Sequence, residues 1–162
     1  MHYAFNAAEV FDVAIQIELN GVAFYRKAAQ YASDEGFRKE LLDLGEMEQE
    51  HVARFTELKR DLIGEQGEAE WFDPDGEAAA YLEAFAAGNV FNVTDDASKA
   101  LTEQPSARDI LDFAIERERD SIMFYVGIKE LVPKKLGRDK IETIINEEMS
   151  HIVLLNRKLR RL

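Results

Sequence analysis

The sequence predicts an all-α protein, a four-helix bundle made of two repeated helical hairpins joined by a long crossover that contains a short helix. Three observations support this fold class. Long stretches place apolar residues at the three- and four-residue spacing of amphipathic helices. Turn and loop residues separate these stretches. The two halves also match at an offset of 100 residues, with 12 identities between 7–62 and 107–162. This period is far longer than that of solenoid repeats, so we expect one domain over 1–162.

The first hairpin is expected over residues 7–63. Asn6 is the predicted N-cap of its first helix, which should continue to about Ala32. Asp34 lies in a short turn and is the predicted N-cap of the second helix. That helix should end near Gly64, a suitable residue for a helix C-terminus.

The crossover is expected over residues 64–106. Its first part, from Gly64 to Gly76, contains three glycines and a proline and therefore predicts a loop. Residues 77–87 are rich in alanine and predict a short helix. Residues 89–105 show no clear periodicity and are expected to be irregular.

The second hairpin is expected over residues 107–162. Ser106 and Asp109 form a predicted capping box at the start of its first helix. Pro133 should end that helix, because proline cannot continue a helical hydrogen-bond ladder. The last helix should begin near Arg138 and continue almost to the last residue.

Each long helix has acidic or histidine residues in the middle of its apolar stripe. Two helices carry a Glu-x-x-His motif, in which both side chains lie on one face a turn apart. The other two carry a single glutamate at a matching place. An unpaired charge in an apolar stripe is costly, and metal coordination removes that cost. The candidate metal-binding and catalytic residues are Glu18, Glu48, His51, Glu118, Glu148 and His151.

The spacing of the four glutamates predicts that they meet. In an antiparallel hairpin, two residues lie level when they are equally far from the turn. Glu18 and Glu48 satisfy this condition in the first hairpin, and Glu118 and Glu148 satisfy it in the second. Two single glutamates and two Glu-x-x-His motifs facing inward are the ligand set of a di-iron or di-manganese carboxylate bundle.

Other residues near the motifs have less specific expectations. Tyr25 and Tyr125 follow the single glutamates by two helical turns. They either pack in the core with a satisfied hydroxyl, or they donate a hydrogen bond or act as a radical buffer near the metals. Four further glutamates are expected to be solvated or ion-paired: Glu46, Glu50, Glu116 and Glu147.

Composition excludes several other classes of function. The chain has no cysteine, so it forms no disulfide, thiolate zinc site or iron–sulfur centre. Its formal net charge of −12 argues against nucleic-acid binding through a basic surface. We expect no membrane span, because no apolar run is long enough, and no signal peptide, so a cytoplasmic location is predicted.

With these motifs in view, the chain resembles the ferritin-like domain of rubrerythrins from about residue 7 to residue 162. The matching stretches are Ala14-Ile15-Gln16-Ile17-Glu18, Phe24-Tyr25, Glu48-x-x-His51, Ala114-Ile115-Glu116-Arg117-Glu118, Phe124-Tyr125 and Glu148-x-x-His151. The resemblance implies a ferritin-like bundle with two iron ions, for which manganese or zinc could substitute. It also implies that Glu48 and Glu148 bridge the metals, while the other two glutamates and both histidines are terminal ligands.

Two departures from the family pattern affect the expected activity. Rubrerythrins usually have a further glutamate three residues after the third-helix ligand, where this chain has Ser121, with Gly21 at the repeat position. They also usually include a cysteine-rich rubredoxin module, which is absent here. Turnover would therefore need an external electron donor, such as a rubredoxin-like protein or another reductase.

Three functions remain open at this stage. The first is an oxidoreductase that reduces hydrogen peroxide or dioxygen while Fe(II) is oxidised, in defence against oxidative stress. The second is a ferroxidase or iron-binding protein for iron storage or detoxification. The third is a metal-binding protein without turnover. A homodimer is the expected assembly.

Overall fold

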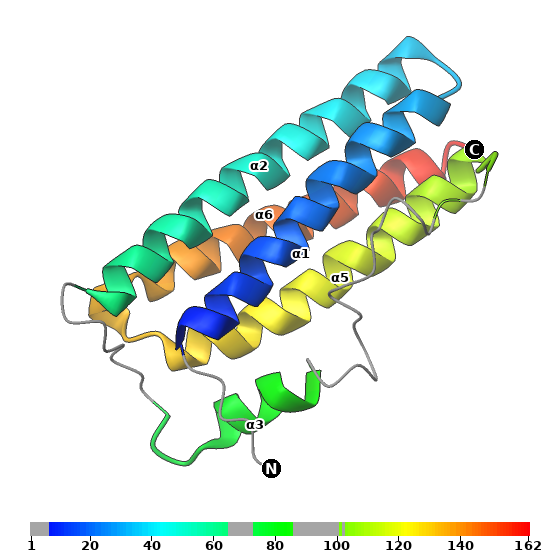
Figure 1. Cartoon of the computed structure of the whole chain (residues 1–162). Coiled ribbons are helices and arrows are strands. Elements are labelled where there is room, and N and C mark those ends of the chain that lie inside the picture. Colours follow the sequence, from blue (N-terminus) through cyan, green and yellow to red (C-terminus); the bar gives the residue numbers. More distant parts are fainter. Residues whose placement is uncertain (1–6, 65–72, 86–100, 102) are drawn as a thin grey trace.

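The computed structural model describes residues 7–64, 73–85, 101 and 103–162, and within these residues every regular element is a helix (Figure 1). The four long helices are α1 (Ala7–Ala28), α2 (Glu35–Ile63), α5 (Ala107–Leu131) and α6 (Arg138–Leu159). A short helix, α3 (Glu77–Ala84), packs against α5 at one end of the bundle. The prediction of an all-α bundle is confirmed.

The helix ends in the first hairpin follow local chemistry. The side chain of Asp34 caps α2 by accepting a hydrogen bond from the backbone N of Phe37 at 2.8 Å. Gly64 ends α2 with a φ of 56°, a conformation that glycine adopts without strain. The first helix ends earlier than expected, because the chain tightens into a 3₁₀ turn at Ala29–Tyr31.

The second hairpin begins at the predicted capping box. The backbone N of Asp109 donates to Ser106 Oγ at 3.1 Å, and the backbone N of Ser106 donates to Asp109 Oδ2 at 2.8 Å. A short 3₁₀ turn at Lys134–Leu136 then leads to Gly137, which has a φ of 109°. A Cβ atom on Gly137 would lie 2.5 Å from Leu58 Cδ2, so glycine also allows this turn to lie against α2.

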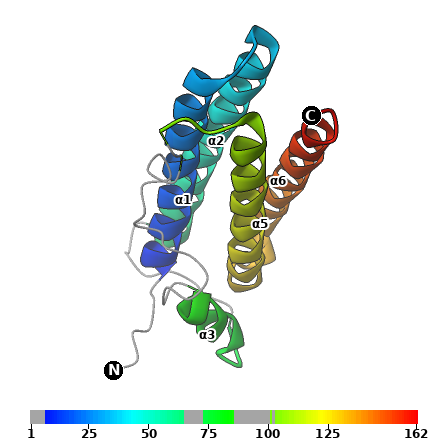
Figure 2. The ribbon, with the colours of Figure 1, turned by 90° about the vertical axis from the view of Figure 1, so that its right-hand side faces the viewer.

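The two hairpins point in opposite directions along the bundle, so that their turns lie at opposite ends. Contacts are most extensive within the pairs α1–α2 and α5–α6, and smaller contacts join α1 to α5 and α2 to α6. Figure 2 shows the two hairpins side by side, viewed along the space between them. Helix α2 ends at one end of the bundle, whereas α5 begins at the other end (Figure 1). The repeated hairpins are therefore related by an approximate twofold axis across the bundle.

The apolar core has two parts. One cluster contains the N-terminal half of α1 and the C-terminal half of α2, with Phe11, Phe55 and Leu58 buried in it. The other contains the opposite halves of these helices, with Phe24 and Leu41 buried. In each long helix the candidate metal ligands fall between the residues of the two clusters. The polar layer is therefore closed by apolar side chains at both ends.

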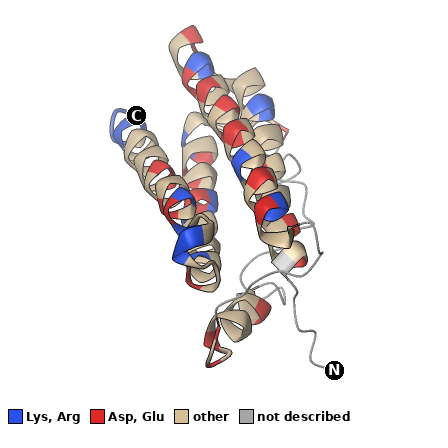
Figure 3. Ribbon diagram, turned by 90° about the vertical axis from the view of Figure 1, so that its left-hand side faces the viewer, with Lys and Arg blue, Asp and Glu red and all other residues tan. Residues whose placement is uncertain are grey.

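Several expectations lie outside the described residues. These are the N-cap at Asn6, residues 86–87 of the short helix, and most of the irregular stretch 89–105. Among the helices that are described, none is both long and apolar enough to cross a membrane. Acidic and basic residues are distributed along the long helices, and basic residues lie at the C-terminal end of α6 (Figure 3). Positive charge there complements the helix dipole.

Candidate metal centre

The six candidate residues converge in the middle of the bundle. One glutamate comes from each of α1 and α5, and one Glu-x-x-His motif comes from each of α2 and α6. All six side chains are buried, with at most 4% of any residue exposed. Burial of four carboxyl groups without compensation would destabilise the bundle strongly.

The first histidine faces three carboxylates with one nitrogen. His51 Nδ1 lies 2.9 Å from Glu148 Oε1, 3.4 Å from Glu48 Oε2 and 3.5 Å from Glu18 Oε2. Two of these glutamates come from its own hairpin, and Glu148 comes from the other. Nδ1 is therefore the nitrogen directed at the centre, and Nε2 points away from it.

The second histidine repeats the arrangement. His151 Nδ1 lies 3.1 Å from Glu148 Oε2, 3.5 Å from Glu118 Oε2 and 3.6 Å from Glu48 Oε1. The two imidazole rings are nearly parallel, with centroids 5.9 Å apart. The approximate twofold symmetry of the hairpins thus extends to the side chains of the centre.

Glu48 and Glu148 are shared between the two halves of the centre. Each directs one oxygen toward one histidine and its second oxygen toward the other. Two overlapping groups result, and in each of them the possible ligand atoms lie within 4.8 Å of one another. The first group is Glu18, Glu48, His51 and Glu148, and the second is Glu48, Glu118, Glu148 and His151. This geometry suits two metal ions bridged by two carboxylates.

The tyrosines link the hairpins across the centre. The hydroxyl of Tyr25 donates to Glu118 Oε1, and the hydroxyl of Tyr125 donates to Glu18 Oε1. Each bond leaves Oε2 of the glutamate facing the histidine of its own group. Both tyrosine rings also pack in the apolar clusters. The tyrosines therefore pack in the core and also donate hydrogen bonds to two of the candidate ligands.

The carboxyl groups of the centre differ in acidity. Burial and the charges of Glu48 and Glu118 raise the pKa of Glu148 to about 8. Burial, with the charges of Glu118 and Glu18, raises the pKa of Glu48 well above its ordinary value. Burial acts in the same direction on Glu118, but hydrogen bonds from Glu148 and His151 outweigh it and lower its pKa to about 2.

Both histidines favour the protonated form in the metal-free protein. Burial alone lowers the pKa of His151, but hydrogen bonds to Glu118 and Glu148 outweigh it and raise the pKa to about 10. The pKa of His51 is raised further, because hydrogen bonds to three glutamates outweigh its burial. Protons thus occupy the places where metal ions would neutralise the carboxylates.

The donor set fits a pair of metal ions. Among the described residues, the buried atoms without a hydrogen bond of good geometry are His51 Nδ1, Glu148 Oε1 and His151 Nε2. The first two of these face each other across the centre at 2.9 Å. Four carboxylates and two imidazoles suit Fe and Mn, and they accept Zn as well.

Glu147 is a site residue whose role the sequence did not reveal. It is ion-paired as expected, with Arg54 Nη1 2.5 Å from its Oε2. The same oxygen also accepts a hydrogen bond from His51 Nε2 at 2.8 Å. Its position directly before Glu148 indicated that it lies near the centre. Its contact with α2, however, depends on helix packing that residue spacing alone does not define.

A small cavity lies beside the centre. Gly21, Ser121 and Arg117 line it. The candidate ligands that line it are Glu18, Glu48 and Glu118. A Cβ atom on Gly21 would lie 3.2 Å from Glu48 Cγ, so glycine leaves space for this bridging carboxylate. The small residue at position 21 thus allows Glu48 to reach the centre.

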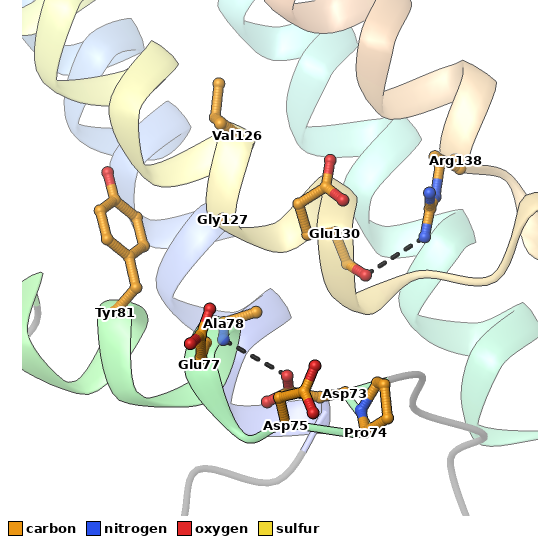
Figure 4. A pocket seen from close by; sticks show the side chains of 10 residues that line it. All are labelled: Asp73, Pro74, Asp75, Glu77, Ala78, Tyr81, Val126, Gly127, Glu130 and Arg138. Carbon is orange, nitrogen blue, oxygen red and sulfur yellow. Dashed lines mark hydrogen bonds between the residues drawn. The ribbon is translucent and has the colours of Figure 1, made fainter.

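A larger surface pocket of about 420 Å³ lies between α3, α5 and the start of α6 (Figure 4). Its polar groups are used to close turns. Asp73 accepts hydrogen bonds from the first backbone N–H groups of α3, and Arg138 donates to the carbonyl oxygens of Glu130 and Val132. None of the six candidate ligands lines this pocket, so it is separate from the centre.

Comparisons with known proteins agree with this architecture. A crystal structure of a Thermotoga maritima protein, described as a ferritin-like diiron-carboxylate protein, matches with a TM-score of 0.66. The match covers 99% of this chain and 98% of that one, at 23% sequence identity. The fold is ferritin-like. This likeness establishes the fold alone, at such a low identity.

One curated protein gives a local sequence match. Over 58 residues the chain is 40% identical to a ferritin-like–encapsulin shell fusion protein of Pyrococcus furiosus. The match covers 36% of this chain and 17% of the length of that relative. No family model matches the sequence.

Proposed function

We propose that this ferritin-like protein binds two iron ions and couples oxidation of Fe(II) to reduction of hydrogen peroxide or dioxygen, as in rubrerythrins. The observation behind the proposal is the pair of buried ligand groups that share Glu48 and Glu148. Carboxylates that bridge two ions can adjust as the charge of the ions changes. Manganese or zinc would substitute for iron in the same ligand set.

The chain's own residues would hold and protect the ions. Glu48 and Glu148 would bridge them, while Glu18 and Glu118 would bind one ion each through the oxygen that the tyrosines leave available. The apolar clusters on both sides exclude water along the bundle axis. We propose that a small oxidant approaches the ligands on the side of the centre that Gly21 and Ser121 line.

The chemistry needs two electrons for each peroxide. A bound iron pair would supply one electron from each Fe(II), and reduction of one peroxide to two waters would also consume two protons. Because the sequence contains no cysteine, an iron–thiolate site within it cannot return the electrons. We therefore propose an external reductase or rubredoxin-like protein as the electron donor, and a cytoplasmic location.

Stopped-flow absorbance tests the proposal directly. Protein loaded anaerobically with Fe(II) is mixed in parallel with hydrogen peroxide and with oxygen-saturated buffer, and ferric absorbance is followed. Faster oxidation by peroxide supports a peroxidase, whereas faster oxidation by dioxygen indicates a ferroxidase or oxidase. Glu48→Ala and Glu148→Ala should abolish the signal, whereas Glu46→Ala, at an exposed position on α2, should not change it. Absence of ferric absorbance in the wild type would contradict the redox proposal.

A second function, ferroxidation for iron storage or detoxification, has one specific observation in its favour. The curated relative is a fusion to an encapsulin shell, as its name states. Iron oxidised next to such a shell could be stored as mineral. Oxidation of many Fe(II) ions per chain in the same assay would favour this function. Tightly held zinc after growth in iron-rich medium would instead favour a site without turnover.

We also propose that the protein is a homodimer that pairs through its second hairpin. Large apolar side chains on the outer faces of α5 and α6 are exposed, each by 43–50%: Met123, Val126, Met149, Val153 and Leu154. The repeat positions in the first hairpin hold Ala23, Arg26, Gln49, Ala53 and Arg54. Light scattering on the purified protein tests the assembly, and a monomeric mass would contradict it.

A further inference from the structure

The outward nitrogens of the two histidines have different surroundings. His51 Nε2 donates to Glu147 Oε2 at 2.8 Å. His151 Nε2 is buried and has no hydrogen-bond partner among the described residues. In both rings Nδ1 faces three glutamates of the centre, so the clearest contrast between the two histidines is the hydrogen bond at Nε2.

The repeat explains why one partner is missing. Glu147 on α6 corresponds to Met47 on α2, which cannot accept a strong hydrogen bond. Arg54, which binds Glu147 Oε2 at 2.5 Å, corresponds to Leu154. Arg54 also lies 3.7 Å from Glu50. One half of the centre therefore has a chain of histidine, glutamate and arginine, and the other half has apolar side chains at the same positions.

A hydrogen-bond acceptor for the outer ring nitrogen of a histidine changes the properties of that histidine as a metal ligand. A carboxylate that accepts the outer N–H fixes the tautomer with Nδ1 free to bind, holds the ring in place and makes Nδ1 more basic. Loss of such a partner typically lowers metal affinity by about 10- to 100-fold. Without a partner, a buried N–H also loses the hydrogen bond that it makes with water.

We propose that Glu147 and Arg54 are positioning residues that make the two metal positions unequal, so that the position at His51 fills first and the position at His151 is the weaker, exchangeable one. This inference rests on the proposed metal pair, but not on which reaction the pair performs. The exchangeable position would be the one from which iron enters and leaves the centre.

Co²⁺ titration of the metal-free protein tests the inference, with visible absorbance reporting the occupied positions. Two binding steps alone would not suffice, because the first ion also repels the second. The steps are therefore assigned with His51→Ala and His151→Ala. The tight step should persist in His151→Ala, and only a weak step should persist in His51→Ala. The reverse assignment would overturn the inference.

Variants at the partner positions complete the test. Glu147→Ala should weaken the first step by about 10- to 100-fold and leave the second unchanged, while Glu147→Gln should restore part of the loss. Met47→Glu should strengthen the second step. Glu46→Ala removes the same charge from an exposed position and should change neither step.

Failure of this inference can be distinguished from failure of the proposed metal centre. Binding of two ions with equal effects of Glu147→Ala on both steps would overturn the inequality and leave the metal centre intact. Absence of Co²⁺ binding in the wild type would overturn both proposals.

Discussion

Metal loading should expel about three to four protons from the centre at pH 7. The groups that hold them are the ones whose pKa is raised in the metal-free protein: Glu48, Glu148, His51 and His151. Each must lose its proton before its oxygen or Nδ1 can bind an ion. When all four groups are protonated, the exchange leaves the charge of the buried cluster unchanged, because four protons and two divalent ions carry the same total charge.

The pH dependence follows from the same count. Below about pH 8, the overall constant for binding two ions should rise by about three to four powers of ten per pH unit. The slope should decrease above pH 8, where Glu148 ionises in the metal-free protein, and again near pH 10 for His151. Binding therefore strengthens toward alkaline pH, with a decreasing slope.

Calorimetry measures the released protons. Mn²⁺ is titrated into metal-free protein at pH 7 in buffers that differ in ionisation enthalpy, and the slope of binding enthalpy against ionisation enthalpy gives the proton number. Glu148→Gln has no proton to lose at this position, so it should release about one proton fewer if it still binds. Release of one proton or none by the wild type would refute the assigned protonation pattern.

Three further predictions concern stability and affinity. The melting temperature of the metal-free protein should fall by about 5 °C or more as the pH rises from about 5 to about 10. The reason is that the raised pKa values make the folded state hold more protons than the unfolded chain. Calorimetric melting checks this, and a melting temperature that does not change with pH would argue against it. Tyr125→Phe should lower Mn²⁺ affinity about tenfold by releasing Glu18 Oε1, and an unchanged affinity would show that this bond has no positioning role. Gly21→Ala should weaken Mn²⁺ binding because the new Cβ would lie 3.2 Å from Glu48 Cγ, even though alanine favours a helix more than glycine does. Ser121→Ala, at the repeat position, is the matched control. Loss of affinity in both variants would point to a general disturbance of the bundle.

The sequence predicted those features of the centre that depend on spacing within one hairpin. Glu18 and Glu48 are level because they are equally far from one turn, and the same rule applies to the second hairpin. Helix ends were predictable where capping is local, as at Asp34. The end of α1 was placed too late, since a 3₁₀ turn and an α-helical turn have similar sequence preferences.

Contacts between the two hairpins could not be predicted from residue spacing. Tyr25 was placed on the correct face, but its partner proved to be Glu118 of the other hairpin. Glu147 was expected to be solvated or ion-paired, and its hydrogen bond to His51 depends on how α6 packs against α2. Sequence periodicity gives the face of a helix, whereas these bonds depend on the rotation and offset between two hairpins.

The sharing of Glu48 and Glu148 across the bundle also has an evolutionary consequence. Neither hairpin alone supplies a complete ligand group, because each group takes one bridging carboxylate from the other hairpin. Two identical hairpins could build such a centre only by pairing, and both halves would then have identical surroundings. Fusion into one gene removes that constraint, since either half can change while the other is preserved. The difference between Glu147 and Met47 is therefore one that a pair of identical hairpins could not have.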